Sequence, residues 1–281
     1  SFSMPVDPPA GPLADVPPVP GVVKPDPILT VDGVEKSFGG LRAVVVDRLQ
    51  FQRGVITGLI GPNGAGKTTL FNVLTGFDQP DTGRWAFDGK PLEQVRAHEM
   101  AERGMVRTFQ LTKALSRLSV IENMKLGARD QRGEGFFRAL WRPSWRDDER
   151  RIEARSDDLL ERFNLAHMRD EYAGTMSGGQ RRLLEMARAL MAEPELLMLD
   201  EPMAGVNPAL RQSLLGHITQ LRDEGRSVIF IEHDMDVVMG ISDWVVVLAE
   251  GTVIAEGPPE SILSNQLVID AYLGAPVGDR P

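Results

Sequence analysis

The residues at positions 61–68 have the types and the spacing that bind phosphate. They read Gly61, Pro62, Asn63, Gly64, Ala65, Gly66, Lys67 and Thr68, in the pattern GxxxxGKT. Glycines let consecutive backbone N–H groups converge on a phosphate, and the N-terminus of the following helix adds positive potential. Lys67 would reach the β- and γ-phosphate oxygens, and the Thr68 hydroxyl would bind Mg²⁺. The sequence therefore predicts a site for a nucleoside triphosphate.

An apolar run at positions 196–199 ends in two acidic residues, Asp200 and Glu201. A buried strand would deliver both carboxylates to the carboxyl edge of a sheet, where ligands bind in open α/β folds. Asp200 would then hold Mg²⁺, directly or through water, and Glu201 would orient and deprotonate an attacking water. Taken alone, the pattern fits a strand followed by an acidic turn equally well. The phosphate-binding loop in the same chain favours the metal site.

A second anion-binding pattern precedes another helical segment, with Ser177 as a good N-cap. The pattern consists of Ser177, Gly178, Gly179 and Gln180. By itself it is only a capped helix start, but two glycines at a helix N-terminus also expose backbone donors to an anion. One phosphate-binding loop does not obviously need this second surface.

The elements that position these residues follow from the apolar patterning. Short β-branched runs at 28–31, 43–51 and 55–60 predict strands, as do runs at 85–87 and 106–109, and helical periodicity dominates from 119 to 190. Strands at 196–199, 227–231, 244–248 and 252–255 then alternate with helices at 208–222, from 235, and at 259–273. This alternation predicts an α/β fold with a mostly parallel sheet and helices on both faces.

Composition and charge limit the classes of protein that remain. The chain has 281 residues, 42% hydrophobic and 25% charged, which is ordinary globular composition, and no apolar run long enough to span a bilayer. A net charge of −9 argues against general affinity for nucleic acid, and the absence of cysteine excludes disulfides and thiolate chemistry. The proline-rich positions 1–27 read as a disordered tail outside the fold. The scattered His98, His167 and His217 share no metal-ligand spacing and read as surface residues.

Together these motifs resemble the ATP-binding subunits of ATP-binding cassette (ABC) transporters, over positions 28 to about 274. In that family, the Ser177–Gln180 pattern is the signature motif. The resemblance makes Gln110 a glutamine that contacts Mg²⁺ and water, His233 a γ-phosphate contact, and Phe38 an aromatic partner of adenine. Two departures are Met176, where the family usually has leucine, and Asn207, where many members carry aspartate; the second bears on contacts across a dimer interface.

The resemblance also implies an architecture and an assembly. The fold would be a P-loop NTPase core of the RecA-like type with an antiparallel β subdomain, a helical subdomain at about 111–190, and a tail at 275–281. Two subunits would pair head to tail, so that the signature motif of one covers the nucleotide held at 61–69, including Thr69, of the other. The partners would be a second copy or a paralogous ATPase, two transmembrane permease subunits and, indirectly, a substrate-binding protein. The location would be the cytoplasmic face of the inner membrane.

Finer resemblance, at 107–110, 231–243 and 271–274, is to the longer ATPase subunit of branched-chain amino-acid uptake systems. Urea or amide importers and lipopolysaccharide-export ATPases stay open as alternatives, because other subunits choose the solute. Two further alternatives are a cassette ATPase without membrane partners and a nucleotide-binding regulator. The first usually carries coiled-coil inserts or two cassettes, which this chain lacks, and the acidic balance does not suit nucleic acid.

Arginines and aromatic residues alternate along positions 129–151, including Trp141 and Trp145. A solvated loop over the helical insert explains this composition. The sharper hypothesis is that the segment faces the membrane or the permease subunits, since apolar rings with long cationic side chains suit that boundary.

Overall fold

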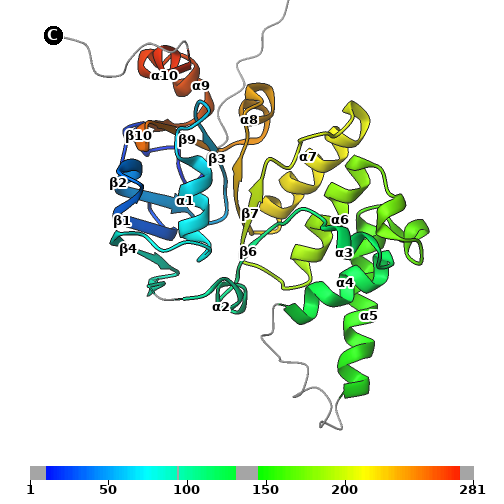
Figure 1. Cartoon of the computed structure of the whole chain (residues 1–281). Helices are drawn as coiled ribbons and strands as arrows, with labels where there is room; N and C mark the ends of the chain where they lie inside the picture. The colour runs from blue at the N-terminus through cyan, green and yellow to red at the C-terminus, as the bar shows by residue number, and fades with distance from the viewer. Residues whose placement is uncertain (1–10, 94, 131–144, 273–281) are drawn as a thin grey trace, which may run out of the picture.

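The computed structural model describes residues 11–93, 95–130 and 145–272. Two sheets form the β structure of this part of the chain (Figure 1). One sheet has four strands in the order β2-β1-β4-β5, and the other has six in the order β10-β9-β3-β8-β7-β6. The described elements thus form an α/β structure, as the alternation of strands and helices predicts.

The four-stranded sheet is antiparallel and is built around a long hairpin. Its strands are β1 (Pro27–Phe38), β2 (Leu41–Gln52), β4 (Thr82–Phe87) and β5 (Lys90–Pro91). Gly39 and Gly40 turn the hairpin with positive φ angles of 53° and 86°, which glycine adopts without steric cost. The strands β1 and β2 therefore extend well beyond the runs 28–31 and 43–51 that composition marks.

The six-stranded sheet is parallel except at one edge. Its strands are β3 (Ile56–Ile60), β6 (Met105–Arg107), β7 (Leu196–Asp200), β8 (Ser227–Ile231), β9 (Trp244–Ala249) and β10 (Thr252–Gly257), of which β10 is antiparallel to β9. Strands β3, β8 and β9 are buried along their whole length, because both faces of the sheet are covered.

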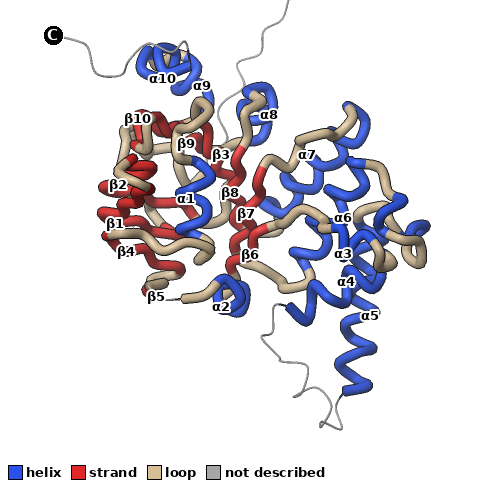
Figure 2. The backbone as a smooth tube through the Cα atoms, viewed as in Figure 1, coloured by secondary structure: helices blue, strands red, loops and turns tan. Residues whose placement is uncertain are grey.

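Alternate residues of these strands enter two separate cores. One face packs with α1 (Lys67–Leu74) and the antiparallel sheet, and the other packs with α4 (Val120–Asp130), α5 (Trp145–Arg162), α6 (Gly178–Leu190) and α7 (Pro208–Asp223). In β7, for example, Met198 belongs to the first core and Leu197 and Leu199 to the second. Figure 2 shows α4, α5, α6 and α7 gathered on one side of this sheet and α1 on the other.

Short helices complete the described part. They are α2 (Ala97–Glu102), α3 (Lys113–Ser116), η2 (Ala166–Met168), η3 (Ala173–Thr175), α8 (Met235–Ile241), α9 (Pro259–Leu263) and α10 (Gln266–Tyr272). The single helix expected at 259–273 is divided into α9 and α10, because the Asn265 carboxamide caps a new start by accepting from Leu267 N–H at 2.9 Å. Within the described ranges, no helix is both long and apolar enough to cross a bilayer.

The proline-rich segment differs from the expected tail. Residues 1–10 lie outside the described part, but residues 11–26 pack on the fold and β1 begins at Pro27. Leu13 is buried in the core, and Lys24 is 3% exposed. The Lys24 ammonium lies 2.5 Å from Glu256 Oε1, which also accepts from Trp244 Nε1 at 3.0 Å. The expectation of a disordered tail was wrong for residues 11–26. Proline content predicts only the local backbone conformation, whereas the contacts that attach this segment to the fold come from single side chains such as Leu13 and Lys24.

Candidate nucleotide-binding site

The predicted phosphate-binding loop connects β3 to α1, as the strand–loop–helix pattern requires. Gly66 is the N-cap of α1 with φ 96°, and no side chain caps this helix start. A Cβ at Gly66 would lie 2.4 Å from the Ala43 carbonyl oxygen, and one at Gly61 would lie 2.2 Å from that of Leu248. These close approaches exclude a residue with a Cβ at either position. Because no side chain caps α1, its first N–H groups are available to an anion.

Lys67 lies against this loop. Its ammonium donates to the carbonyl oxygens of Gly61 and Pro62. Burial lowers the pKa of Lys67, and the negative charge of Glu201 opposes that shift. This electrostatic interaction indicates that Glu201, which follows the carboxyl end of β7, is close enough to the loop to influence Lys67.

The carboxyl ends of β7 and β8 bring Glu201 and His233 together. These strands are parallel neighbours, and Glu201 N–H donates to the Ile231 carbonyl at 3.0 Å. The distance from His233 Nδ1 to Glu201 Oε1 is 3.9 Å, and their side chains are 66% and 48% exposed. Glu201 has a left-handed backbone with φ 45°, which is uncommon for a residue other than glycine and turns its side chain out of the strand. Both side chains are therefore accessible to a ligand at this edge.

Asp200, the last residue of β7, pairs with an arginine that the sequence motifs did not single out. Arg107 Nη2 donates to Asp200 Oδ2 at 2.8 Å. Among the described side chains, none donates to Oδ1 of Asp200, and the Asp200 side chain is 30% exposed. One carboxylate oxygen thus remains open towards solvent.

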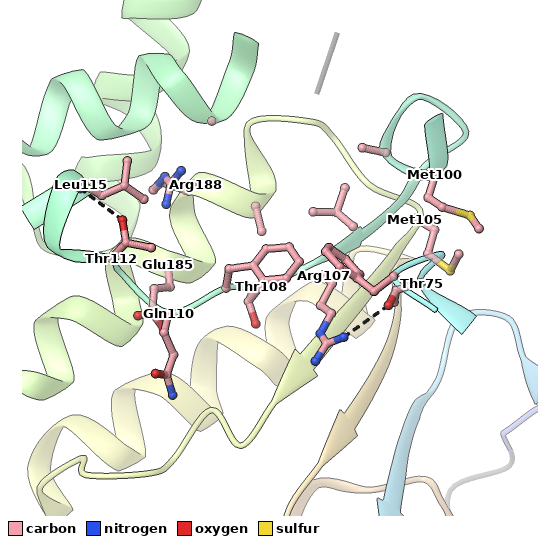
Figure 3. Close-up of a pocket in the computed structure, with 16 residues that line it drawn as sticks. Thr75, Met100, Met105, Arg107, Thr108, Gln110, Thr112, Leu115, Glu185 and Arg188 are labelled. Atoms are coloured by element: carbon pink, nitrogen blue, oxygen red, sulfur yellow. Dashed lines mark hydrogen bonds between the residues drawn. The ribbon is translucent and has the colours of Figure 1, made fainter. Parts of the chain in front are cut away.

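Gln110 lies in an exposed segment after β6, at the edge of a cavity of about 360 Å³. Figure 3 shows the cavity between the end of β6 and the helical elements, with Gln110, Arg107 and Glu185 on its walls. Glu185, only 7% exposed, accepts from Leu111 N–H at 2.9 Å and so fixes the backbone next to Gln110. The glutamine therefore extends from an anchored segment.

Three oxygen-bearing side chains of the predicted site suit a hard divalent cation. Thr68 offers a hydroxyl, Gln110 an amide oxygen and Asp200 a carboxylate with one open oxygen, and Mg²⁺ prefers oxygen ligands. These residues fit Mg²⁺ bound with a nucleotide. Within the described part of the chain, no group of three or more His, Asp and Glu side chains forms a metal cluster by itself, so such an ion would depend on phosphate oxygens as well.

Phe38 ends β1 and is 49% exposed, with the Lys36 ammonium 5.1 Å from the ring centroid. The β1–β2 hairpin that carries it also reaches the phosphate-binding loop, since Ala43 and Val44 approach Gly66. An exposed ring on this hairpin is available to stack on a base.

The signature residues form a complete capping box at the start of α6. Ser177 Oγ accepts from Gln180 N–H at 3.2 Å, and Gln180 Oε1 accepts from Ser177 N–H at 2.9 Å. Gly179 is required by packing, because a Cβ there would lie 2.4 Å from Leu210 Cδ1. Helices α6 and α1 pack on opposite faces of the parallel sheet. The structure therefore does not bring the signature residues to the phosphate-binding loop of the same chain (Figure 1).

The two departures from the family pattern have local explanations. Asn207 is the N-cap of α7, and its side-chain oxygen accepts from Leu210 N–H at 3.0 Å, as an aspartate would. Met176 is buried at 3% exposure among apolar residues, where leucine and methionine are nearly interchangeable.

Comparison with known proteins identifies the family. The family model "ABC transporter" matches residues 46–204, more than half of the chain. The branched-chain amino acid transport ATP-binding protein BraF of Pseudomonas aeruginosa is 42% identical over 250 residues, which is 88% of this chain and 98% of the relative. The chain belongs to the ABC transporter ATP-binding family. Its class is therefore that of an ATPase, and the predicted family and fold class are confirmed.

Further relatives and solved structures support the same family assignment. The LivG proteins of Escherichia coli and Archaeoglobus fulgidus are 42% and 41% identical, each over 88% of this chain. A second family model, "Branched-chain amino acid ATP-binding cassette transporter", matches residues 252–277. Crystal structures of a nucleotide-free ATP-binding cassette and of a cassette in its ADP conformation both have a TM-score of 0.79, at 35% and 36% identity over 88% of this chain.

Sequence reasoning missed Glu232 in this ABC cassette. Glu232 is 1% exposed, and its carboxylate accepts from Met203 N–H at 2.9 Å and from His233 N–H at 3.3 Å. Burial raises the pKa of Glu232, while these two hydrogen bonds oppose the shift. The side chain ties the loop after Glu201 to the backbone of His233. An acidic residue directly after the buried strand at 227–231 was the available signal.

Two other sequence hypotheses have different outcomes. His217 is half-buried and stacks on Phe163 at 4.3 Å between ring centroids, so it is a packing residue rather than a surface one; burial lowers its pKa. His167 is exposed, and the side chain of His98 lies outside the described residues. Most of the segment 129–151 is likewise outside them, including Trp141 and the Trp145 side chain, so its proposed orientation stays a prediction.

Proposed function

We propose that the chain is the ATP-hydrolysing subunit of an importer for branched-chain amino acids or related solutes. The observation that carries the proposal is near full-length similarity to BraF and LivG proteins, whose names state branched-chain amino acid transport. The match of the C-terminal residues 252–277 to a model named for the same transporters supports it independently of the ATPase motifs. ATP hydrolysis in this chain would drive uptake through other subunits.

Phosphate binding would use the loop between β3 and α1. The backbone N–H groups of residues 61–69 and the Lys67 ammonium would hold the β- and γ-phosphates, and the uncapped start of α1 adds positive potential. Thr68, Gln110 and Asp200 would hold Mg²⁺, which neutralises phosphate charge when bound. Phe38 would stack on the adenine.

Hydrolysis would use the two side chains at the carboxyl ends of β7 and β8. Glu201 would orient a water molecule and take its proton, since it is accessible and adjacent to the loop. His233 would donate a hydrogen bond to the γ-phosphate, and Glu232 would fix its backbone. The distance of 3.9 Å between His233 Nδ1 and Glu201 Oε1 is short enough for one ligand to touch both.

The signature residues would act on the nucleotide of another subunit. Because α6 and α1 lie on opposite sides of the parallel sheet, Ser177, Gly178, Gly179 and Gln180 have no access to the loop of their own chain. A head-to-tail dimer with a second copy or a paralogous ATPase would place them over the bound ATP. Their exposed N–H groups then close the site, and hydrolysis would release the pair.

The cavity beside Gln110 would receive a segment of a permease subunit. Phe77 and Phe109 line it and are 52% and 50% exposed, which leaves apolar surface for a partner. Two permease subunits would hold the ATPase at the cytoplasmic face of the inner membrane, and a substrate-binding protein would act with them. No nucleic acid is part of this assembly.

Co-purification tests the proposal. The full chain, produced together with the permease subunits of a branched-chain amino-acid importer from the same organism, should be recovered from membranes with them, and reconstituted vesicles should take up leucine when ATP is present. Uptake of urea or an amide instead would assign a related importer. Recovery without any membrane protein would overturn the transporter function and favour a cassette ATPase of another kind.

A further inference from the structure

Arg107 connects three elements beneath the proposed metal site. It is the last residue of β6, and its side chain is 10% exposed. Nη2 donates to Asp200 Oδ2 at 2.8 Å, and Nη1 donates to Asn72 Oδ1 at 2.7 Å and to Thr75 Oγ1 at 3.3 Å. Figure 3 shows the guanidinium reaching from β6 towards Thr75. One planar group therefore ties the end of β7 to helix α1.

Asn72 lies on the same helix as Thr68, a proposed Mg²⁺ ligand. Asn72 follows Thr68 by four residues, so both lie on the same face of α1, one turn apart. Of the three proposed Mg²⁺ ligands, Thr68 lies on α1 and Asp200 ends β7. Arg107 bridges these same two elements one helical turn below the site, and it uses only one of the two Asp200 oxygens.

Aromatic rings hold the guanidinium in place. Its Cζ lies 5.3 Å from the Phe71 ring centroid and 5.6 Å from the centroids of Phe77 and Phe109. Phe77 and Phe109 contact each other edge to face, with centroids 5.0 Å apart. Cation–π contacts of this kind restrict the guanidinium plane, and a lysine would not reproduce hydrogen bonds from two separate nitrogens to β7 and α1.

We propose that Arg107 is the positioning residue of the Mg²⁺ site: its bond to Oδ2 fixes the Asp200 carboxylate relative to α1 and leaves Oδ1 without a side-chain donor. The proposal rests on nucleotide binding at the loop between β3 and α1. Without the bridge, the Asp200 side chain would have to be ordered when the ion binds, and this loss of conformational freedom weakens metal binding. The effect concerns metal affinity and leaves the phosphate-binding loop unchanged.

Binding of Mn²⁺ tests this role, because Mn²⁺ shares the oxygen preference of Mg²⁺ and its free form is visible by EPR. The full chain with bound ADP is titrated with Mn²⁺, and ADP affinity is measured separately in EDTA. Arg107→Lys keeps the positive charge and loses the second arm, and Asn72→Ala keeps the Arg107–Asp200 pair and removes its shorter bond to α1, leaving the one to Thr75. We expect both to raise the apparent Kd for Mn²⁺, about three- to tenfold for Arg107→Lys, with ADP affinity in EDTA within about twofold of wild type.

Arg103→Lys is the matched control, because Arg103 precedes β6 and donates to the Pro91 carbonyl at 2.9 Å, away from Asp200; it should bind Mn²⁺ like wild type. Wild-type Mn²⁺ affinity in both test variants would overturn the positioning role. An equal loss of ADP affinity in EDTA would overturn it too, since it would show a general structural effect. If the wild-type chain bound no ADP, that result would contradict the proposed function itself, whereas the outcomes above contradict only the role of Arg107.

Discussion

Glu201 stands directly after β7 with a left-handed backbone, next to Lys67 and 3.9 Å from His233. Glu201→Gln removes the proposed base and keeps the size of the side chain, so we expect ATP turnover to fall by about 10²- to 10⁴-fold, the usual contribution of a general base. Nucleotide affinity should be retained. Phosphate release and nucleotide titration of the same preparation measure the two effects.

The control for Glu201→Gln is Glu161→Gln on the exposed side of α5, which should hydrolyse ATP at the wild-type rate. Turnover of Glu201→Gln at a comparable rate would show that another group takes the proton.

Glu232 provides a pH-dependent prediction. Burial raises the pKa of Glu232 above its value in the unfolded chain, so the folded protein binds its proton more tightly. Its contribution to the free energy of unfolding is therefore fully present below the unfolded pKa and is lost as the pH rises through the folded pKa. Glu232→Gln cannot titrate. We expect wild type to gain stability relative to this variant as the pH falls from 7 towards 5.

Urea unfolding of both proteins at pH 7, 6 and 5 measures this difference. A difference that stays constant over the range, or changes in the opposite direction, would contradict the raised pKa.

Sequence patterns located the motif residues on their elements but not the partners of those residues. The loop at 61–68, the acidic strand end and the capped helix at Ser177 all follow from local rules of spacing, and the structure has each between the expected elements. Arg107 and Glu232 were not recognised, since their roles depend on contacts with Asn72 and Met203, residues distant in the chain. Local patterning carries no information about such contacts.

At the scale of elements, the phosphate-binding loop depends on two close backbone approaches. Gly66→Ala would place a Cβ 2.4 Å from the Ala43 carbonyl oxygen at φ 96°, so the hairpin and the loop would have to separate. Gly54→Ala is the matched control, with φ 72° and no neighbour within 4 Å. The control should lose about 1–2 kcal/mol of unfolding free energy through its backbone conformation.

Gly66→Ala should lose about 1–3 kcal/mol more than Gly54→Ala through overpacking, together with nucleotide binding. Urea unfolding and nucleotide titration measure both losses. Equal destabilisation of the two variants would show that the backbone at Ala43 can move away from an added Cβ with no loss of stability.

The N-terminal segment is attached to the sheet by a buried ion pair. The side chains of Lys24 and Glu256 are 1% and 0% exposed. Lys24→Met leaves the Glu256 carboxylate buried without its cation, which should cost about 3–5 kcal/mol of unfolding free energy. The double variant Lys24→Met, Glu256→Gln removes both charges and should regain most of that loss. Denaturant unfolding of the three proteins tests the pair, and a single variant as stable as wild type would refute it.

At the scale of the whole molecule, the parallel sheet separates the two phosphate-binding surfaces. Helix α1, which follows Gly66, packs on one face and the signature helix α6 on the other, so in the proposed dimer each chain would contribute to two different sites. The apolar alternation of β7 and β8 produces this separation, because successive side chains enter opposite cores. Binding and hydrolysis should therefore depend on different numbers of subunits.

Ser177→Arg tests this separation. The side chain lies at an exposed helix start remote from the loop of its own chain, so the variant should bind ATP with wild-type affinity as an isolated subunit. Hydrolysis in the assembled pair should nevertheless be lost, because the arginine side chain would prevent the signature residues from covering the nucleotide held by the second subunit. Lys67→Ala gives the opposite pattern, with nucleotide affinity lost in the isolated chain. Nucleotide titration and phosphate release separate the two, and weakened binding by isolated Ser177→Arg would show that both motifs serve one nucleotide within one chain.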